Sequence, residues 1–138
     1  MVQDVLKVGG LLVAVLLAWL PTPVQAAAKQ DAGKMAYLRY CSACHGEDAK
    51  GDGVVSGFLR PKPTDLTFIA KRNGGKFPFM KILHAIDGTT SIAAHGKGDM
   101  PVWGEVLKEE APAASAGEAA VRGKLTLITS YLQSIQRK

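Results

Sequence analysis

Apolar residues recur at helical spacing in three segments, and these segments predict the main helices of the chain. The longest runs from Val121 to Gln136, and its apolar residues fall on one face: Leu125, Ile128, Tyr131, Leu132 and Ile135. A second runs from Pro78 to Ile86, with Gly88 shortly after it as a stop signal. A third runs from Asp31 to Cys41, with Asp31 as its expected N-cap. No alternating pattern is long enough for a sheet, so the sequence predicts an all-α fold.

The segments between these helices are rich in glycine and proline and predict loops. The longest are residues 47–63 and residues 89–101. Short helices are expected over 64–71, beginning at Thr64 or Asp65, and over 102–108. Residues 109–120 are rich in alanine and predict a surface linker or insertion. The pattern therefore describes a small helical domain with long loops.

Residues 1–26 predict a secretory signal peptide in front of this domain. The run from Val8 to Leu20 is apolar, and two prolines end it. As a helix it would span about 20 Å, which is too short for the roughly 30 Å of hydrocarbon in a bilayer. Small residues three and one before a cut after Ala26 match the cleavage pattern. We therefore expect residues 27–138 to form one domain in the periplasm, the alternative being an uncleaved membrane anchor.

Composition narrows the classes of function. The chain has 138 residues, of which 47% are hydrophobic and 21% charged, as in a folded domain rather than a disordered tail. The net charge of +5 comes from scattered residues without a long basic run, so nucleic acid is not an expected partner. Two cysteines are too few for a disulfide framework or a four-cysteine zinc site. Aromatic residues make up only 7%, which fits a small core completed by a cofactor.

Both cysteines belong to the pentapeptide Cys41-Ser42-Ala43-Cys44-His45, which is the attachment pattern of c-type haem. Thiols three residues apart lie on the same side of one turn, where both reach the vinyl groups on one edge of a porphyrin. The histidine that follows supplies a neutral nitrogen ligand for iron. The alternative is a redox or structural disulfide, but a thioredoxin-like domain needs alternating strands and helices, which this pattern lacks. The motif therefore predicts one haem c, held by Cys41 and Cys44 as thioethers and by His45 as an axial ligand of its iron.

An iron with His45 on one side needs a second axial ligand, or it remains an open site. Four downstream residues carry a suitable atom: Met80, His84, His95 and Met100. Met80 and His84 share one predicted helix, where packing among apolar residues is the simplest role of the methionine. His95 and Met100 both lie in the second glycine-rich loop, and a proline follows Met100. The residues favour Met100, whose thioether would raise the reduction potential, and leave His95 as the alternative.

With these features the chain resembles the class I cytochromes c. Gly33, Tyr37 and Cys41 follow each other at steps of four, as in the first helix of that family. There a glycine lets the last helix approach, and an aromatic residue packs on it. Ile128 and Tyr131 resemble the matching apolar and aromatic pair of the last helix. The resemblance implies the cytochrome c fold, with N- and C-terminal helices packed together around one covalently attached haem.

Two loops extend the resemblance, which covers roughly residues 33–136. Met100-Pro101, with Trp103 shortly after, is similar to the family's distal-ligand loop and implies Met100 as the sixth ligand. Pro63 lies in a stretch that resembles the segment whose carbonyl accepts the N–H of the proximal histidine, and the carbonyl of Pro63 or of Thr64 is the candidate.

Other residues are candidates for the haem pocket. Tyr37 is expected to pack there, and Trp103 either donates its indole N–H to a haem propionate or packs in the core. Arg60 and Lys62 are candidates to neutralise the propionates.

An iron held by His45 and Met100 admits no substrate unless it loses a ligand. The sequence therefore predicts an electron carrier rather than an enzyme, with redox proteins as donor and acceptor and no small-molecule substrate. The alternatives are a fixed cytochrome subunit of a larger oxidoreductase complex, with membrane association, and an open-site haem that binds gas or substrate.

Overall fold

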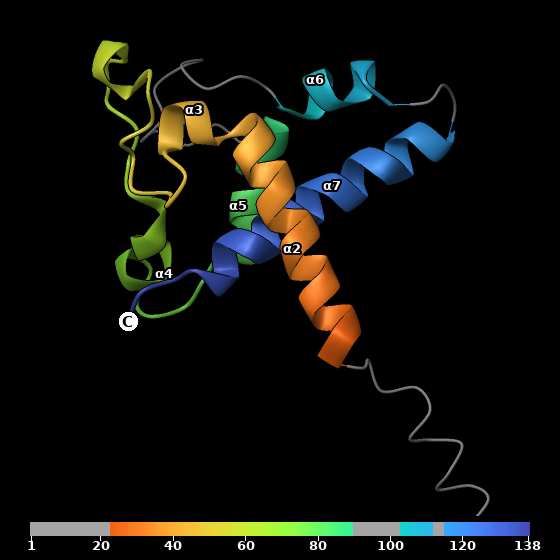
Figure 1. The fold of residues 1–138 in the computed structure, drawn as a ribbon, viewed down its shortest axis with the longest axis horizontal. Helices are drawn as coiled ribbons and strands as arrows, with labels where there is room; N and C mark the ends of the chain where they lie inside the picture. The colour runs from red at the N-terminus through yellow and green to blue at the C-terminus, as the bar shows by residue number, and fades with distance from the viewer. Residues whose placement is uncertain (1–22, 90–102, 112–114) are drawn as a thin grey trace, which may run out of the picture.

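The computed structural model of the chain describes residues 23–89, 103–111 and 115–138 (Figure 1). Within these residues the fold is helical and has no strand, which confirms the all-α prediction. The longer helices are α2 (Pro23–Tyr40), α5 (Phe79–Asp87), α6 (Trp103–Glu109) and α7 (Ser115–Ser134). Shorter helical turns lie between them: α3 (Ser42–His45), η1 (Ser56–Phe58), η2 (Leu66–Phe68) and α4 (Ile69–Arg72). Most of the expected signal peptide, and the loop with His95 and Met100, lie outside the described residues.

Helices α2 and α7 cross at Gly33 and form the most extensive helix contact in the described part of the chain (Figure 1). A Cβ on Gly33 would collide with the carbonyl oxygen of Leu127 and lie 3.0 Å from the Cβ of Tyr131. One turn further along α2, the ring of Tyr37 packs on that of Tyr131, with centroids 5.3 Å apart. The expected pairing of the first and last helices, with a glycine and an aromatic pair at the crossing, is therefore present.

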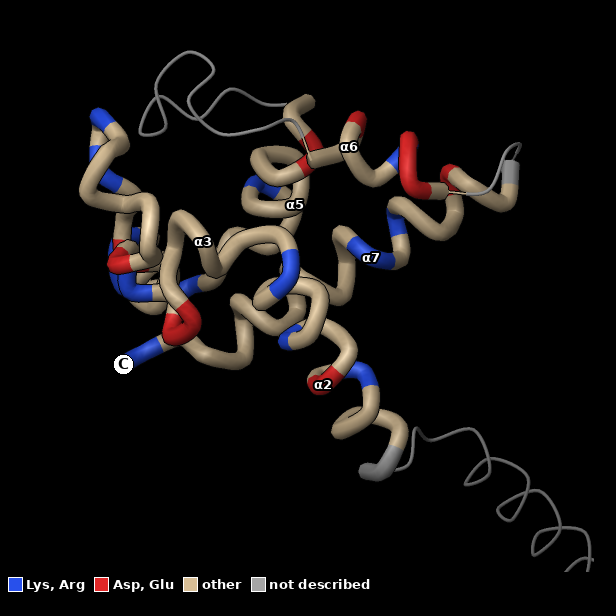
Figure 2. The backbone as a smooth tube through the Cα atoms, turned by 45° about the horizontal axis from the view of Figure 1, so that its top comes forward, with Lys and Arg blue, Asp and Glu red and all other residues tan. Residues whose placement is uncertain are grey.

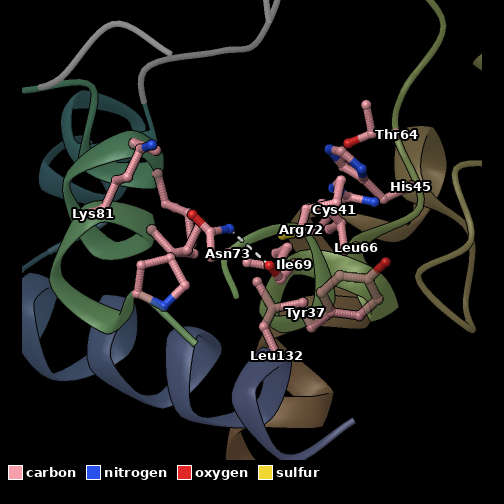
Figure 3. Close-up of a pocket in the computed structure, with 14 residues that line it drawn as sticks. Tyr37, Cys41, His45, Thr64, Leu66, Ile69, Arg72, Asn73, Lys81 and Leu132 are labelled. Atoms are coloured by element: carbon pink, nitrogen blue, oxygen red, sulfur yellow. Dashed lines mark hydrogen bonds between the residues drawn. The ribbon is translucent and has the colours of Figure 1, made fainter. Parts of the chain in front are cut away.

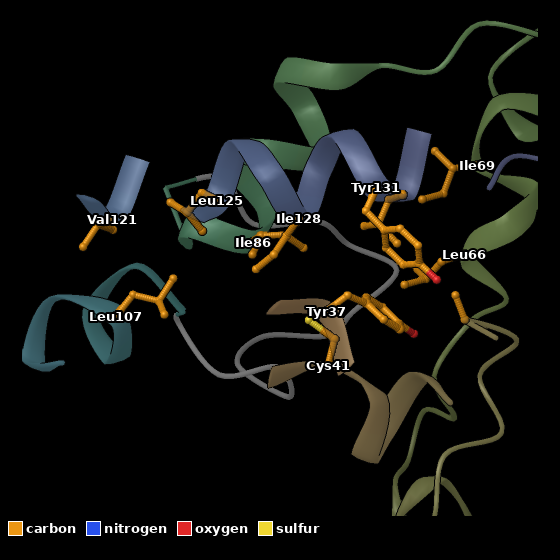
Figure 4. Close-up of a cluster of buried hydrophobic side chains, with 12 residues drawn as sticks. Tyr37, Cys41, Leu66, Ile69, Ile86, Leu107, Val121, Leu125, Ile128 and Tyr131 are labelled. Carbon is orange, nitrogen blue, oxygen red and sulfur yellow. The ribbon is translucent and has the colours of Figure 1, made fainter. Parts of the chain in front are cut away.

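The hydrophobic core extends from this crossing along α7 (Figure 4). Leu125 and Ile128 of α7 are each 1% exposed, and Ile86 from α5 and Leu107 from α6 pack into the same cluster. Complete burial of such a side chain contributes roughly 1.5–3 kcal/mol to folding. One face of α7 thus holds α2, α5 and α6 together.

Two helix boundaries differ from the sequence prediction. Helix α2 begins at Pro23, so Asp31 lies inside it instead of capping it. Residues 25–32 are all exposed, and an exposed alanine-rich stretch has helix propensity without an apolar stripe to reveal it. Helix α7 begins at Ser115, so residues 115–120 of the predicted linker are its first turns. The interpretation of 109–120 as a linker is therefore wrong for its second half.

Other boundaries agree with the sequence. The Asp65 side chain accepts a hydrogen bond from the N–H of Thr67 at 2.8 Å and caps η2. Gly88 ends α5 in the left-handed conformation, at φ 84°. Lysine and arginine occur on each of the four longer helices, and Figure 2 shows these charges distributed over the molecule. No helix in the described ranges is both long and apolar enough to cross a membrane.

The side chain of Gln136 ties the end of α7 to the segment of η2 and α4. Its amide nitrogen donates to the carbonyls of Leu66 at 2.9 Å and Leu132 at 2.7 Å. Its amide oxygen accepts from the N–H of Ala70 at 2.8 Å. One side chain therefore pairs three backbone groups, two of which lie 66 and 70 residues away in sequence.

A Gln136→Glu variant is expected to be less stable by about 1–3 kcal/mol, because a carboxylate would face two carbonyls that lose their donor. The matched control is Gln133→Glu, an equal change at an exposed position in the last turn of α7. Urea denaturation measures both free energies of unfolding. Equal effects of the two substitutions would show that the side-chain bonds of Gln136 contribute nothing.

Candidate haem site

The pentapeptide folds as a single helical turn directly after α2. The N–H groups of Cys44 and His45 both donate to the carbonyl of Cys41, at 3.2 and 2.9 Å. The hydroxyl of Ser42 donates to the carbonyl of Leu38 at 2.5 Å, which joins the turn to the end of α2. The spacing of the motif therefore forms the turn expected from the sequence.

The loop of residues 46–55 closes over the outside of this turn. Three of its N–H groups donate to successive carbonyls of the turn: Gly51 to His45 at 2.8 Å, Gly53 to Cys44 at 3.2 Å and Val55 to Ala43 at 3.1 Å. A Cβ on Gly53 would collide with carbonyl oxygens of the turn, so only glycine allows this close approach. The backbone of the motif is therefore held from both α2 and the loop.

Both cysteines are free thiols in the structure. Burial raises the pKa of the Cys41 thiol to about 12, and the nearby Cys44 adds to the increase. A redox-active pair of cysteines needs a lowered thiol pKa, because the thiolate is the nucleophile in disulfide exchange. The surroundings of Cys41 thus count against the disulfide oxidoreductase alternative.

A cavity of about 290 Å³ lies beside the turn, and Cys41 and His45 both line it (Figure 3). Tyr37 of α2 and Leu132 of α7 also line this cavity. The other apolar lining residues come from the segment between η2 and the end of α5: Leu66, Ile69, Pro78, Ile82, Ala85 and Ile86. Its volume is close to the lower end of the range for small-molecule sites, about 300–1,000 Å³.

These residues fit a covalently bound haem. The imidazole of His45 is 6% exposed and lines a mostly apolar cavity, which suits a flat apolar macrocycle bound through its iron. Both thiols lie on the turn that presents this imidazole. The polar lining residues are few, as in most ligand sites: Thr64, Arg72, Asn73 and Lys81.

Tyr37 connects the helix crossing with the turn. Its side chain is fully buried, and its hydroxyl donates to the carbonyl of Gly46, the residue after His45, at 2.6 Å. Burial raises the pKa of Tyr37 well above its usual range, so the hydroxyl stays protonated and remains a donor. Tyr37 also lines the cavity, where the sequence placed it, and its contact with haem remains a prediction.

The structure separates the four candidates for the second axial ligand. Met80 is 58% exposed, so the expectation that it packs in the core is wrong. His84 is partly buried, and its Nδ1 lies 3.1 Å from the hydroxyl oxygen of Thr89. Neither residue lines the cavity, because Lys81, Ile82 and Ala85 take the cavity side of α5. His95 and Met100 lie outside the described residues, and Met100 remains the predicted ligand.

Neither Trp103 nor Pro63 lines the cavity. The indole of Trp103 packs edge-on against Tyr40, with ring centroids 5.6 Å apart. Of its two expected roles, this contact agrees with packing in the core. The carbonyl of Pro63 lies against Gly51, while its neighbour Thr64 lines the cavity beside His45 (Figure 3). Of the two carbonyl candidates for the His45 N–H, the residue at the cavity is Thr64.

The cations that line the cavity are not the two expected from the sequence. Arg60 donates to the carbonyls of Gly57 and Leu59 in its own loop, at 3.0 and 2.8 Å, and neither Arg60 nor Lys62 lines the cavity. Arg72 at the end of α4 and Lys81 in the first turn of α5 take that place. Sequence reasoning missed them because Arg72 looks like an ordinary solvated charge. Lys81 carries no stronger signal, because at helical spacing it lies off the apolar stripe formed by Phe79, Ile82 and Ile86 of α5.

Residues 28–116 match the family model described as cytochrome C oxidase, cbb3-type, subunit III. The chain belongs to this family of c-type cytochromes. The match to cbb3-type subunit III begins in α2, includes the pentapeptide and Met100, and ends at the start of α7. No curated protein and no solved structure matches the chain.

Membership in the cbb3-type subunit III family confirms the resemblance to class I c-type cytochromes that the motifs carry. It implies a covalently bound haem with its iron, and an electron-transfer haem protein. The match ends before most of α7, so the crossing of α2 and α7 is an observation of this structure.

Proposed function

We propose that the chain is an exported monohaem c-type cytochrome that passes single electrons between redox protein partners. The observation that carries the proposal is the placement of Cys41 and His45 on one wall of an apolar cavity, in the turn that also holds Cys44. Bound haem supplies an iron that takes up and releases one electron. The role of this chain is to fix that group and to keep water and substrates from it.

Each assigned residue has a distinct part in this function. Cys41 and Cys44 would form the thioethers, and His45 and Met100 would bind the iron. Packing of Tyr37 and Leu132 against the cavity excludes water from one wall. An iron held by both His45 and Met100 would leave no position open for a substrate, which favours a carrier over an enzyme.

Export is part of the same proposal, with residues 1–26 as a cleaved signal and 27–138 as the domain in the periplasm. The family match begins at Ala28, which lies just after the expected cut. Residues 25–32 are exposed along α2, so removal of the residues before Ala27 would not uncover the core at Gly33. Mass spectrometry of the exported protein tests the cut directly.

The test is production of the full chain in a host that exports proteins and matures c-type cytochromes. We expect one haem per chain that resists acid-acetone extraction, with a sharp reduced α band. A Cys41→Ala/Cys44→Ala variant should lose all covalent haem, because no thiol remains to form a thioether. Ser42→Ala changes a residue of the same pentapeptide that carries no haem ligand, and it should keep the haem.

Exported, folded wild-type protein without covalent haem, from a host that matures another c-type cytochrome in the same culture, would overturn the proposal.

The family description favours a second candidate function, a fixed subunit of an oxidase complex. Fractionation of cells that naturally produce the protein separates the two. A mobile carrier would appear in the periplasmic extract as a single chain, whereas a fixed subunit would remain with the membrane and co-migrate with an oxidase after mild detergent extraction.

A further inference from the structure

The cavity has a cationic rim, which we define as Arg72 and Lys81. These are the lysine and arginine residues that line the cavity in the described part of the chain. Both residues are exposed to solvent and also line the cavity, so their charges lie where the cavity opens to solvent. The rim is formed by two segments, the end of α4 and the first turn of α5.

Local bonds orient the arginine side of this rim. Nη2 of Arg72 donates to the carbonyl of Asp65 at 2.7 Å, and the next residue, Asn73, donates from its side-chain nitrogen to the carbonyl of Ile69 at 2.7 Å. A guanidinium has five N–H donors, so one bond to a carbonyl leaves donors for a carboxylate. Arg72 is therefore held in place and still able to bind an anion.

Lys81 lies across the cavity from the cysteine turn. Figure 3 shows Lys81 on α5 at one side, with Cys41 and His45 at the other. In haem the vinyl groups, which the cysteines bind, and the two propionates occupy opposite halves of the macrocycle. A haem bound through Cys41 and Cys44 would thus direct its carboxylates away from the turn and toward the mouth.

We propose that the cationic rim binds the haem propionates, with Arg72 and Lys81 as the positioning residues. This inference rests on the proposed function, because it requires the covalently attached haem. The inference assigns this role to Arg72 and Lys81 in place of Arg60 and Lys62, which the sequence suggested and which do not line the cavity. Arg60 is bonded to two carbonyls of its own loop. Charge-assisted hydrogen bonds from such cations are about twice as strong as neutral ones, so the rim would fix the haem edge opposite the thioethers.

The experiment uses matured, haem-loaded protein with isotope-labelled propionate carboxyl carbons. Redox-induced infrared difference spectra then report the carboxylate stretching bands of the propionates. Arg72→Gln and Lys81→Gln should each shift a propionate band, and Arg72→Lys should restore much of the wild-type position because it keeps the charge. The matched controls Arg60→Gln and Lys76→Gln remove the same charge at exposed positions outside the cavity lining, and they should leave the bands unchanged.

The reduction potential supplies an independent readout. A positive charge near the iron favours the reduced state, so each rim substitution should lower the potential and change the electron-exchange equilibrium constant with a mediator by about threefold. The controls should change it by less. Unshifted propionate bands in both rim variants would overturn the inference while covalent haem in the wild-type protein upheld the proposed function; wild-type protein without haem would overturn both.

Discussion

A Met100→Leu variant of the matured protein is expected to lose its second axial ligand and become an open-site haem protein. Leucine has nearly the volume of methionine but no thioether, so packing is kept while the iron loses its sulfur ligand. The oxidised protein should lose the weak near-red band of methionine-to-ferric charge transfer. The reduced protein should bind carbon monoxide readily, because one coordination position becomes open. The reduction potential should fall by on the order of 0.1 V or more, since axial ligands tune haem over roughly 0.8 V.

The residues that follow Met100 in the sequence are fixed to the helical bundle. Met100 precedes the start of α6 at Trp103 by three positions, and α6 is fixed to the bundle. Trp103 packs on Tyr40, and Gly104 approaches Asp87 at the end of α5 so closely that a Cβ would collide with it. The hydroxyl of Tyr40 also donates to Glu110, just after α6, at 2.6 Å. The chain is thus anchored immediately after the predicted ligand.

Met80→Leu is the matched control, because Met80 is 58% exposed on α5 and lies outside the cavity lining. It should leave the near-red band, the carbon monoxide affinity and the potential unchanged. A wild-type protein without the near-red band, whose low-spin spectrum survives Met100→Leu and disappears in His95→Ala, would contradict methionine ligation and establish His95.

A Gly33→Ala variant is expected to destabilise the protein although alanine is the better helix former. The added Cβ would collide with the carbonyl oxygen of Leu127 and press on Tyr131, so α2 and α7 must separate or bend. Overpacking of this kind costs about 1–3 kcal/mol. Denaturant unfolding of the haem-loaded protein, followed by helical circular dichroism, measures the change in the free energy of unfolding.

The same substitution at Gly123 is the control and should have the opposite sign. Gly123 lies in α7 with no atom within 4 Å of an added Cβ, so alanine there meets open space. Higher helix propensity should then stabilise the protein by about 0.5–1 kcal/mol. If Gly33→Ala stabilised the protein as Gly123→Ala does, the close approach of α2 and α7 would not be a feature of the folded protein.

The sequence predicted elements that have a strong local signal. The stripe of α7 and the stop of α5 at Gly88 were both recognised, because apolar periodicity and a glycine terminator act over a few residues. The start of α2 was misplaced because exposed alanine-rich residues carry no stripe. The burial of Met80 was predicted wrongly, because the side of a short helix that faces the core is set by the elements packed against it.

The candidate site divides in the same way. Cys41, Cys44 and His45 were predicted together, because haem attachment needs two thiols and an imidazole within one turn. These groups therefore lie within five consecutive residues. The surroundings of that turn were not predicted. Gln136 binds backbone groups 66 and 70 residues earlier, and no local sequence pattern indicates such a partner.

By itself, the sequence determined the all-α class, the haem-attachment pentapeptide and the apolar face of α7, because each depends on spacing within a few turns of the chain. The crossing of the first and last helices was expected only from the family resemblance. Only the tertiary structure decided which residues surround the cavity. The cavity beside the cysteine turn is lined by Leu132 from α7, by Thr64 before η2, and by Arg72 and Lys81 on either side of a turn. The physical reason is that these contacts join segments far apart in sequence, and their geometry is set by the packing of α2, α5 and α7 into one core.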